Sequence, residues 1–506
     1  MGNAYIMVVM GIILAKGIGF YRDIAFSGTF GTSVEADIYF QVFNIVNLIF
    51  AGIGVALSTL VIKNMNKSEN AGNEKAYISS FLRKSFLAFS GVALLVALFA
   101  EPIVKYILLP GISEEHISLA VRLMHIMAPS LVFVVIAYII SGVLQNEKVF
   151  FITAIMSLPF NAVIILSLFI PGVTLTTVGL VTTLGWFLHI IILLPSFYKK
   201  GYGFFTSSRS LSAKKGANPE ILWIFISNMM YQLCFYTDRA FVSGTEGMAS
   251  TFSYASNIFV IIASIFVVAM STVFFPAISK NYEEGNIDYI NDLLRYIITV
   301  MVAIFVPFLL VVGVFGKDII RLIYERGEFT SQATVAVSTI LLIYSFGILG
   351  YVCQELFNKI LYLAGKYKLC VFGTIGVIAA NAISNILITK YVPDVNHPGL
   401  GISNVNLLIA LSSSVFLFLY AVLVASAIKA VVGAYWKKDV LSDIVKIIVA
   451  AVFALAAYVV FNTFLPALTH GKFSFIVPLC ACGIIYITVL AVTGVLKRLI
   501  KKKGDN

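Results

Sequence analysis

Charged side chains within apolar stretches are the residues of this sequence best suited to chemistry. Lys16, Arg22 and Asp23 lie in the first apolar stretch, and Asp37 lies at the start of the second. A charge inside a bilayer costs at least about 2.5 kcal/mol on insertion scales, so such groups normally face a wet cavity or a charged partner. Cationic side chains lining a cavity suit an anionic group such as a phosphate, diphosphate or carboxylate. These residues therefore predict a site for an anionic ligand.

Helical spacing places the first three charges close to one another. Lys16, Gly19 and Asp23 share one face of a helix, with Arg22 at its flank. Small residues at this position let another backbone or a substrate approach closely. The alternative for Arg22 and Asp23 is a structural one, in which both lie at the membrane interface with their charged ends in water. Lys16 lies deeper in the apolar stretch, which favours a place in a cavity.

A second group of polar residues lies in the other half of the chain. Asp238 and Arg239 are adjacent, and Asn381 and Asn385 are one helical turn apart in a later apolar stretch. Two amide oxygens on one face, together with the Asp238 carboxylate, would offer hard oxygen ligands to a small cation. Asparagines at this spacing also serve as hydrogen-bond pairs between helices, and that alternative stays open.

The composition shows what kind of elements must position these residues. The chain has 506 residues, of which 60% are hydrophobic and 12% charged, with a mean hydropathy of +0.98. Soluble proteins are about 45–50% apolar and about 25% charged. A soluble enzyme, a disordered scaffold and a nucleic-acid-binding domain are therefore excluded. Fourteen apolar stretches follow one another along the sequence, and each is suited to a spanning helix of roughly 20 residues. They are centred near residues 13, 49, 95, 131, 160, 187, 229, 265, 304, 345, 380, 416, 454 and 484.

The net charge of +11 has an uneven distribution that predicts topology. Of the 35 Lys and Arg residues, 25 follow even-numbered stretches or lie in the C-terminal tail. Cytoplasmic loops carry an excess of Lys and Arg. The distribution therefore predicts a multi-pass protein of the cytoplasmic membrane with both termini in the cytoplasm. The positive charge is then explained by orientation and by contact with anionic lipids, with no nucleic-acid partner.

The two halves of the chain resemble each other. Ser27-Gly28-Thr29 recurs as Ser243-Gly244-Thr245, Val55-Ala56-Leu57-Ser58-Thr59 as Val268-Ala269-Met270-Ser271-Thr272, and Lys63-Asn64 as Lys280-Asn281. The copies begin six stretches apart and so share one orientation, as in transporters built from parallel repeats. The predicted fold is an all-α polytopic membrane protein of 14 transmembrane helices, with two parallel six-helix lobes and an appended helix pair.

The domain boundaries follow from this repeat. We predict an N-terminal lobe over 1–200, a basic cytoplasmic linker over 201–217 and a C-terminal lobe over 218–432. The appended pair occupies 433–496, and a basic cytoplasmic tail covers 497–506. Rocking of two such lobes about a central route gives alternating access.

Nothing in the sequence indicates catalysis. His125 and His189 lie in apolar stretches without an acid or nucleophile pattern, and we interpret both as hydrogen-bonded core histidines. The five cysteines lack metal-type spacing, and no phosphate-binding loop of the GxxxxGK[ST] form occurs. We therefore expect a transporter and not an enzyme.

Several motifs carry a family resemblance. The run from Lys16 to Asp23, followed by Phe30-Gly31, Ala36-Asp37, Phe43-Asn44 and Asn47, resembles the opening signature of the MurJ (MviN) lipid II flippases. This family belongs to the multidrug/oligosaccharidyl-lipid/polysaccharide exporter superfamily. Ile49-Phe50-Ala51-Gly52-Ile53-Gly54 is similar to the Firmicutes type, because proteobacterial members carry an arginine pair there. Further matches are Gly142-Val143-Leu144, Asn161, Asp238-Arg239, Tyr254-Ala255 and Phe275-Pro276-Ala277-Ile278-Ser279.

The resemblance implies roles for individual residues. Lys16 takes the place of a cavity arginine, and Arg22, Asp23 and Asp37 match residues that hold the lipid-linked diphosphate. Asn47 and Arg239 lie in matching motifs and join the substrate-binding candidates. Asp238 matches a sodium ligand of some members, Asn381 matches a second ligand, and Asn385 stands where a carboxylate is expected. One departure is Ser256-Asn257, where proteobacterial members have an Asp-Arg pair.

The expected function is that of a flippase. It would translocate lipid II, the undecaprenyl-diphosphate-linked peptidoglycan precursor, from the inner to the outer leaflet for cell-wall biogenesis and cell shape. The hydrocarbon tail would lie in a groove made with the appended helix pair. Sodium or the membrane potential would drive transport, and cell-wall synthesis proteins would be partners.

Three alternatives remain at this point. They are an exporter of another polyprenyl-linked oligosaccharide for a surface polysaccharide, a non-transporting paralogue, and a multidrug cation antiporter. The cationic residues Lys16 and Arg22 argue against the antiporter, because a carrier of cations would be expected to have an acid-rich cavity.

Overall fold

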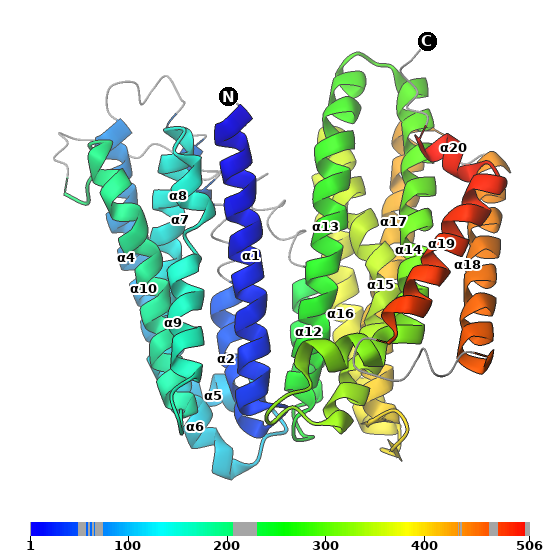
Figure 1. Ribbon diagram of the computed structural model, residues 1–506. Coiled ribbons are helices and arrows are strands. Elements are labelled where there is room, and N and C mark those ends of the chain that lie inside the picture. Colours follow the sequence, from blue (N-terminus) through cyan, green and yellow to red (C-terminus); the bar gives the residue numbers. More distant parts are fainter. Residues whose placement is uncertain are drawn as a thin grey trace. The chain divides into compact units, whose positions relative to one another are not determined.

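The computed structural model is helical almost throughout the part of the chain that it describes, which is residues 2–48, 57–58, 61–62, 65, 74–205, 230–433, 435, 438–464 and 474–500 (Figure 1). In chain order the helices are α1 (Gly2–Phe30), α2 (Val34–Leu48), α4 (Glu74–Leu98), α5 (Ala100–Ile103), the π-helix η3 (Val104–Leu108), α6 (Glu114–Met127), α7 (Ser130–Asn146), α8 (Phe150–Ala154), α9 (Leu158–Leu168), α10 (Leu175–Lys199), α12 (Met230–Phe241), α13 (Met248–Glu283), α14 (Ile287–Tyr324), α15 (Ser331–Leu363), α16 (Tyr367–Tyr391), α17 (Asn404–Val432), α18 (Lys438–Phe464), α19 (Ile476–Val492) and α20 (Val495–Ile500). The short strands β1 (Asn396–His397) and β2 (Ile402–Ser403) pair antiparallel in the loop before α17.

The helices coincide with the apolar stretches of the sequence. Among the described residues, 10 helices are long and apolar enough to cross a membrane, and each lies on one of the predicted stretches. Helices α1, α2 and α12 lie on the first, second and seventh stretches, and the shorter apolar helix α19 lies on the last. The predicted fold class, an all-α polytopic membrane protein, is confirmed.

Polar side chains fix where several helices begin. The first backbone N–H groups of a helix have no partner within the helix, and a Ser, Thr or Asn just before it can accept from them. Thr174, Asn286, Thr330 and Ser403 each accept a hydrogen bond from the backbone N–H three residues later, at the starts of α10, α14, α15 and α17. These caps set the limits of helices that run through long apolar segments.

The chain forms two compact units. The first comprises residues 1–232, 239–250 and 326–329. Within it, α1 packs against α8 and α9, and α10 packs against α6, α7 and α9. Buried aliphatic side chains of α4, α7 and α10 form its core, among them Ile78, Val135, Ile139 and Leu193. In this unit α1 therefore lies with one side against α9.

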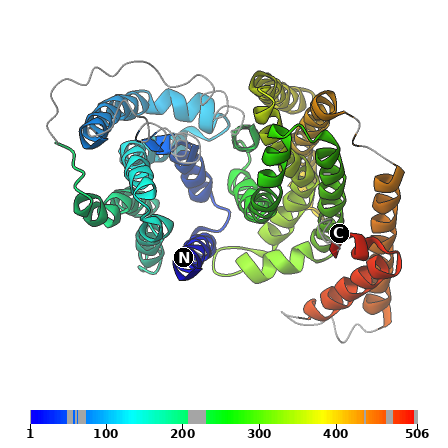
Figure 2. The same cartoon turned by 90° about the horizontal axis from the view of Figure 1, so that it is seen from above.

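The second unit comprises residues 233–238, 251–325 and 330–506. Helix α15 packs closely against α17, and at Gly350 an added Cβ would lie 2.5 Å from the Leu417 carbonyl oxygen. Glycine at this position lets the two backbones touch. Helices α18 and α19 lie side by side and pack against α14, as the two views show (Figures 1 and 2).

The Ser-Gly-Thr motifs of the internal repeat share one hydrogen-bond pattern. Ser27 Oγ donates to the Ile24 carbonyl at 2.8 Å, and Ser243 Oγ donates to the Ala240 carbonyl at 2.7 Å. Two residues after each motif comes a glycine with positive φ, Gly31 at 55° and Gly247 at 77°, a conformation that favours glycine. The first copy forms the last turn of α1, whereas the second is a turn that follows the end of α12.

The domain boundaries stay predictions. Most of the linker, residues 206–217, lies outside the described residues, as do residues 501–506 of the tail and most of the Val55–Thr59 and Lys63-Asn64 repeat motifs.

Candidate functional site

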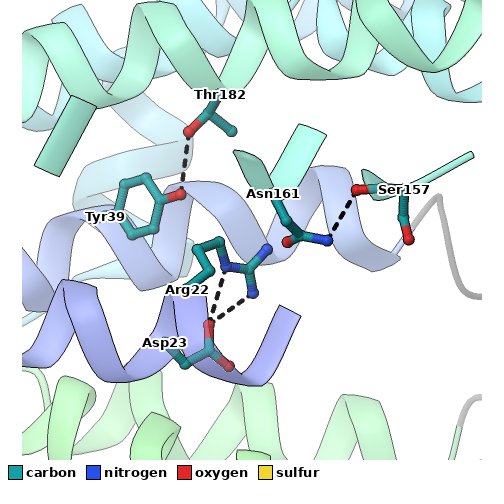
Figure 3. A network of polar contacts seen from close by, with 6 residues as sticks. All are labelled: Arg22, Asp23, Tyr39, Ser157, Asn161 and Thr182. Carbon is teal, nitrogen blue, oxygen red and sulfur yellow. Dashed lines mark hydrogen bonds and ion pairs between the residues drawn. The ribbon is translucent and has the colours of Figure 1, made fainter. Parts of the chain in front are cut away.

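Arg22 and Asp23 form an ion pair on α1. Arg22 Nε and Nη2 donate to Asp23 Oδ1 at 3.1 and 2.7 Å (Figure 3). The side chains are 17% and 11% exposed. Adjacent residues of a helix do not face each other, so the guanidinium must fold back over the helix surface to reach the carboxylate. This pair places a partly accessible guanidinium in the first unit, where the sequence predicts a cationic site.

Two aromatic rings lie beside the Arg22 guanidinium. Its central carbon lies 5.6 Å from the centroid of the Phe43 ring on α2 and 5.5 Å from that of Phe160 on α9. Both distances are in the range of cation–π contacts. Sequence reasoning misses the two rings, because phenylalanines in apolar stretches are common and their spacing here is not distinctive.

Lys16 and Asn161 lie on α1 and α9, the two helices that pack against each other here. Lys16 is exposed, whereas Asn161 is 4% exposed. Asn161 Nδ2 donates to the Ser157 carbonyl at 2.9 Å (Figure 3). A Cβ added at Gly19 would lie 3.7 Å from the Asn161 amide group, so α1 approaches the Asn161 side chain at this glycine. Around Gly17 there is open space. The predicted close approach is therefore found at Gly19.

Asp37 holds the beginning of another helix. Its side chain is buried, with 3% of the residue exposed. Its Oδ2 accepts the Gly247 N–H at 2.8 Å, and its Oδ1 accepts the Ser250 N–H at 2.5 Å. These are the backbone groups at the start of α13, and a carboxylate at a helix N-terminus is favourable. Asp37 thus acts as a cap supplied by α2, a role that the sequence does not indicate.

Two further substrate-binding candidates lie on other parts of the chain. Asn47 is partly buried near the described end of α2. Arg239 is 5% exposed on α12. The contacts described above join Arg22 to Asp23 and to the two rings, and neither Asn47 nor Arg239 takes part in them.

The turns at one end of the first unit interlock. This turn cluster consists of residues 27–33, 109–113, 243–250 and 326–329, all of which belong to the first unit. The Glu328 N–H donates to the Gly28 carbonyl at 3.0 Å, and the Gly111 N–H donates to Ser243 Oγ at 3.1 Å. A Cβ at Gly247 would overlap the Thr32 carbonyl. Backbone-to-backbone contacts of this kind, with Asp37 capping α13 beside them, hold the four segments together.

The second polar group forms a buried cluster in the second unit. Asp238 is fully buried, and its Oδ2 accepts the Tyr344 O–H at 2.9 Å. Its Oδ1 accepts from Asn385 Nδ2 at 2.9 Å and from Asn381 Nδ2 at 3.5 Å. Ser412 Oγ donates to Asn385 Oδ1 at 2.7 Å. The predicted grouping of Asp238 with both asparagines is therefore found on α12 and α16, with hydroxyl groups from α15 and α17.

One oxygen of this cluster has no hydrogen bond. Asn381 Nδ2 donates to Ser412 Oγ and Ser413 Oγ at 3.0 and 2.9 Å. Asn381 Oδ1 is buried and has no hydrogen-bond partner within the described residues. A buried carbonyl oxygen without a donor is costly. Both asparagines turn Nδ2 and not Oδ1 toward Asp238, so a small monovalent cation, which prefers oxygen ligands, would need their amide groups rotated. The carboxylate, the amide oxygens and the hydroxyl oxygens would then supply hard oxygen ligands.

The two histidines differ from each other. His125 Nε2 lies 2.9 Å from the Ala97 carbonyl oxygen, so the predicted hydrogen bond is confirmed, but the place in the core is wrong because the residue is exposed. The same prediction is wrong for His189, because neither ring nitrogen has a hydrogen-bond partner among the described residues and the side chain is buried. Its ring lies instead against Phe160 and Trp186, with centroids 5.4 and 4.8 Å apart.

An apolar groove runs between the appended helices and α14. Leu310 and Phe315 of α14, Tyr458 of α18, and Leu479, Gly483 and Tyr486 of α19 are among the residues that line it. The Tyr486 O–H donates to the Ala303 carbonyl at 2.7 Å, so the polar end of this side chain is satisfied. The remaining lining is suited to a hydrocarbon chain.

The sequence matches one family over most of its length. A model of the family "Lipid II flippase MurJ" matches residues 26–494. A probable lipid II flippase MurJ of Buchnera aphidicola is 24% identical over 423 residues, which cover 79% of this chain and 80% of the relative. A lipid II flippase MurJ of Thermosipho africanus is 24% identical over 351 residues, which cover 68% of this chain and 71% of the relative.

Solved structures share the fold. A lipid II flippase MurJ in an inward closed conformation superposes with a TM-score of 0.76 at 22% identity, covering 98% of this chain and 100% of the other. An inward-facing multidrug transporter of the MATE family superposes with a TM-score of 0.63 at 13% identity, covering 84% of this chain and 99% of the other.

Proposed function

The chain belongs to the lipid II flippase MurJ family, and from this premise we propose that it carries lipid II from the inner to the outer leaflet of the bacterial cytoplasmic membrane. The observation that carries the proposal, beyond membership, is the Arg22–Asp23 pair in the first unit. A planar guanidinium donates parallel hydrogen bonds to phosphate oxygens, and the exposed Lys16 lies less than two turns away on the same helix. The diphosphate of lipid II is the group that these cations suit.

One other feature supports this function. The apolar groove between α14, α18 and α19 offers a surface for the polyprenyl tail. The substrate's charged part would thus be held by α1, and its tail would remain in an apolar environment.

Complementation tests the choice of substrate. The wild-type chain should restore growth of a bacterial strain depleted of its own lipid II flippase. Restoration requires lipid II itself, so an exporter of another polyprenyl-linked oligosaccharide or a non-transporting paralogue would fail at a matched protein level. That failure would contradict the proposal. We propose that peptidoglycan synthesis proteins, which act on the flipped lipid, are the partners of this chain. The same strain supplies them.

We also propose that sodium binds the Asp238 cluster and, together with the membrane potential, supplies the drive. Asp238, Asn381 and Asn385 would hold the ion, with Tyr344, Ser412 and Ser413 close by. The ion would neutralise the buried carboxylate. A ligand that binds only the folded state stabilises it by about 2.7 kcal/mol at 100 times its Kd. Sodium should therefore raise the thermal midpoint of the wild type above its value in potassium at equal ionic strength.

The Asp238→Asn variant should lose this sodium-specific shift. Asp318→Asn, which changes an exposed acid on α14 of the same unit, is the matched control and should keep it. A wild type without any sodium-specific shift, combined with loss of complementation in Asp238→Ala, would show that Asp238 has a structural role.

The proposed orientation places both termini in the cytoplasm. Glu283 then lies on the cytoplasmic side, after the eighth stretch, and Asp394 lies outside, before α17. Both residues are exposed. In a background without native cysteines, Asp394→Cys should react with a membrane-impermeant maleimide in intact cells, and Glu283→Cys should react only after lysis. The reverse labelling pattern would overturn the orientation.

A further inference from the structure

The Arg22 guanidinium lies beside a stacked pair of rings that come from different helices. Phe43 of α2 and Phe160 of α9 have centroids 6.4 Å apart and planes tilted by 22°. The central carbon of the guanidinium is almost equally far from both, at 5.6 and 5.5 Å. Asp23 holds two of its nitrogen atoms. A group fixed by two rings and a carboxylate has little freedom to rotate.

The ring on the α2 side is held in place by its neighbours. Phe43 stacks on Tyr39 with centroids 5.7 Å apart and planes 8° from parallel. The Tyr39 hydroxyl shares a hydrogen bond of 3.1 Å with Thr182 on α10 (Figure 3). Tyr39 also stacks on Phe26 of α1 at 4.6 Å. Phe43 is therefore anchored, through Tyr39, to α1 and α10.

Phe160 is anchored from the other side. Its ring lies 4.7 Å from that of Trp186 and 5.4 Å from that of His189, and it is within 11° of parallel to the latter. At Gly185 an added Cβ would lie 2.7 Å from Phe160 Cδ2, so the absence of a side chain there lets the ring fit. Phe160, Trp186 and His189 are all at most 3% exposed. Phe160 therefore has no room to move away from Arg22.

His189 is a ring without a polar role in this arrangement. Neither of its nitrogens has a hydrogen-bond partner among the described residues. A protonated imidazole behind Phe160 would repel the Arg22 cation, and its burial also disfavours charge. A neutral ring can instead stack on Phe160 and keep it in contact with the guanidinium.

We propose that Phe43 and Phe160 are positioning residues that orient the Arg22 guanidinium toward the diphosphate of the substrate, with His189 acting as a stacking ring behind Phe160. This inference rests on the proposed function, because it assumes that Arg22 contacts the diphosphate. An arginine held in its binding orientation loses less side-chain freedom when the ligand arrives. A lysine could not replace it fully, because an ammonium group lacks a planar surface that can lie against the rings.

The test is a double-mutant cycle. The measured quantity is the affinity of the protein in detergent for undecaprenyl diphosphate. Phe43→Leu should weaken binding about two- to twelve-fold, the range expected when a side chain must be immobilised on binding, with a thermal midpoint close to that of the wild type. Phe43→Trp, which keeps a ring, should retain most of the affinity. In an Arg22→Lys background, Phe43→Leu should have a much smaller effect, because the partner of the ring is gone.

Each outcome bears on the proposal. An equal loss of affinity on Phe43→Leu in the wild-type and Arg22→Lys backgrounds would overturn it, as would unchanged affinity in Phe43→Leu. If Phe43→Leu lowers the thermal midpoint, the Phe43→Trp variant decides the question. This variant retains a ring, so a loss of affinity at a normal thermal midpoint would also overturn the proposal. His189→Phe should bind like the wild type, and weaker binding would refute its role as a ring. A wild type that does not bind the diphosphate would instead contradict the proposed function.

Discussion

Arg22→Ala should abolish complementation of a strain depleted of its lipid II flippase, at an unchanged protein level. The substitution removes a partly exposed guanidinium and leaves the Asp23 carboxylate without this ion-pair partner. A hydrogen bond to a charged group contributes about 1.5–3 kcal/mol, which corresponds to roughly 10- to 100-fold in affinity. The remaining carboxylate would also repel the diphosphate. Both effects act in the same direction, so the loss should be large.

Two further variants sharpen this prediction. Arg22→Lys keeps the positive charge but lacks the planar guanidinium group, so its activity should fall between those of the wild type and Arg22→Ala. Arg122→Ala is the matched control, because Arg122 is an exposed arginine of α6 in the same unit. Full complementation by Arg22→Ala would show that the assigned cationic site is wrong.

Asp37→Ala should have the second-largest effect, and it should act first on stability. The buried carboxylate accepts the N–H groups of Gly247 and Ser250, and its removal leaves both donors without this acceptor at a buried helix end. Each such loss costs about 1–3 kcal/mol, so the folded protein should be destabilised by roughly 2–6 kcal/mol in total. The measurement is the thermal midpoint of the purified protein in detergent, followed by complementation.

The neutral variant separates charge from shape. Asp37→Asn keeps one acceptor oxygen but turns an amide N–H₂ toward a backbone donor, so its midpoint should lie between those of the wild type and Asp37→Ala. Glu35→Gln neutralises another acid in the same turn of α2, one that is only partly buried, and should change the midpoint little. If Asp37→Ala unfolds at the wild-type temperature, the cap on α13 does not contribute to stability.

Asp37 shows what the sequence can and cannot indicate. An acid at the start of an apolar stretch is detectable, because intramembrane charge is rare and needs a reason. Its partners are backbone N–H groups more than 200 residues away, and backbone groups have no signature in a sequence. The motif alone suggests a ligand contact, whereas the structure shows a helix cap. Spacing along one helix predicts which residues share a face, but it does not predict which groups of other segments contact that face.

The same limit applies to the rings around Arg22. The cationic site is detectable because its residues are charged, but Phe43 and Phe160 are two of 41 phenylalanines. Only the packing of α1, α2 and α9 brings these rings to the guanidinium. At the other site, Asp238 and the two asparagines are predictable because carboxylates and carboxamides are unusual in apolar stretches. Tyr344 and the serines that complete that cluster are not unusual there, so sequence reasoning misses them.

The fold is the most predictable feature. Long apolar stretches leave the chain few choices, since backbone polar groups within a bilayer must be satisfied internally and helices do this within one segment. The hydropathy pattern therefore predicts where α4, α7, α10 and the long helices α13 to α18 lie. The family resemblance found in the opening motif is confirmed by a family model that matches residues 26–494.

The most direct test of the function is the accessibility of lipid II in the outer leaflet of cells depleted of their own flippase. Expression of the wild-type chain should restore labelling of lipid II by a membrane-impermeant probe, and Arg22→Ala at the same protein level should not. Arg122→Ala should label like the wild type. Outer-leaflet lipid II that stays at the depleted level with the wild-type protein present in the membrane would contradict the account.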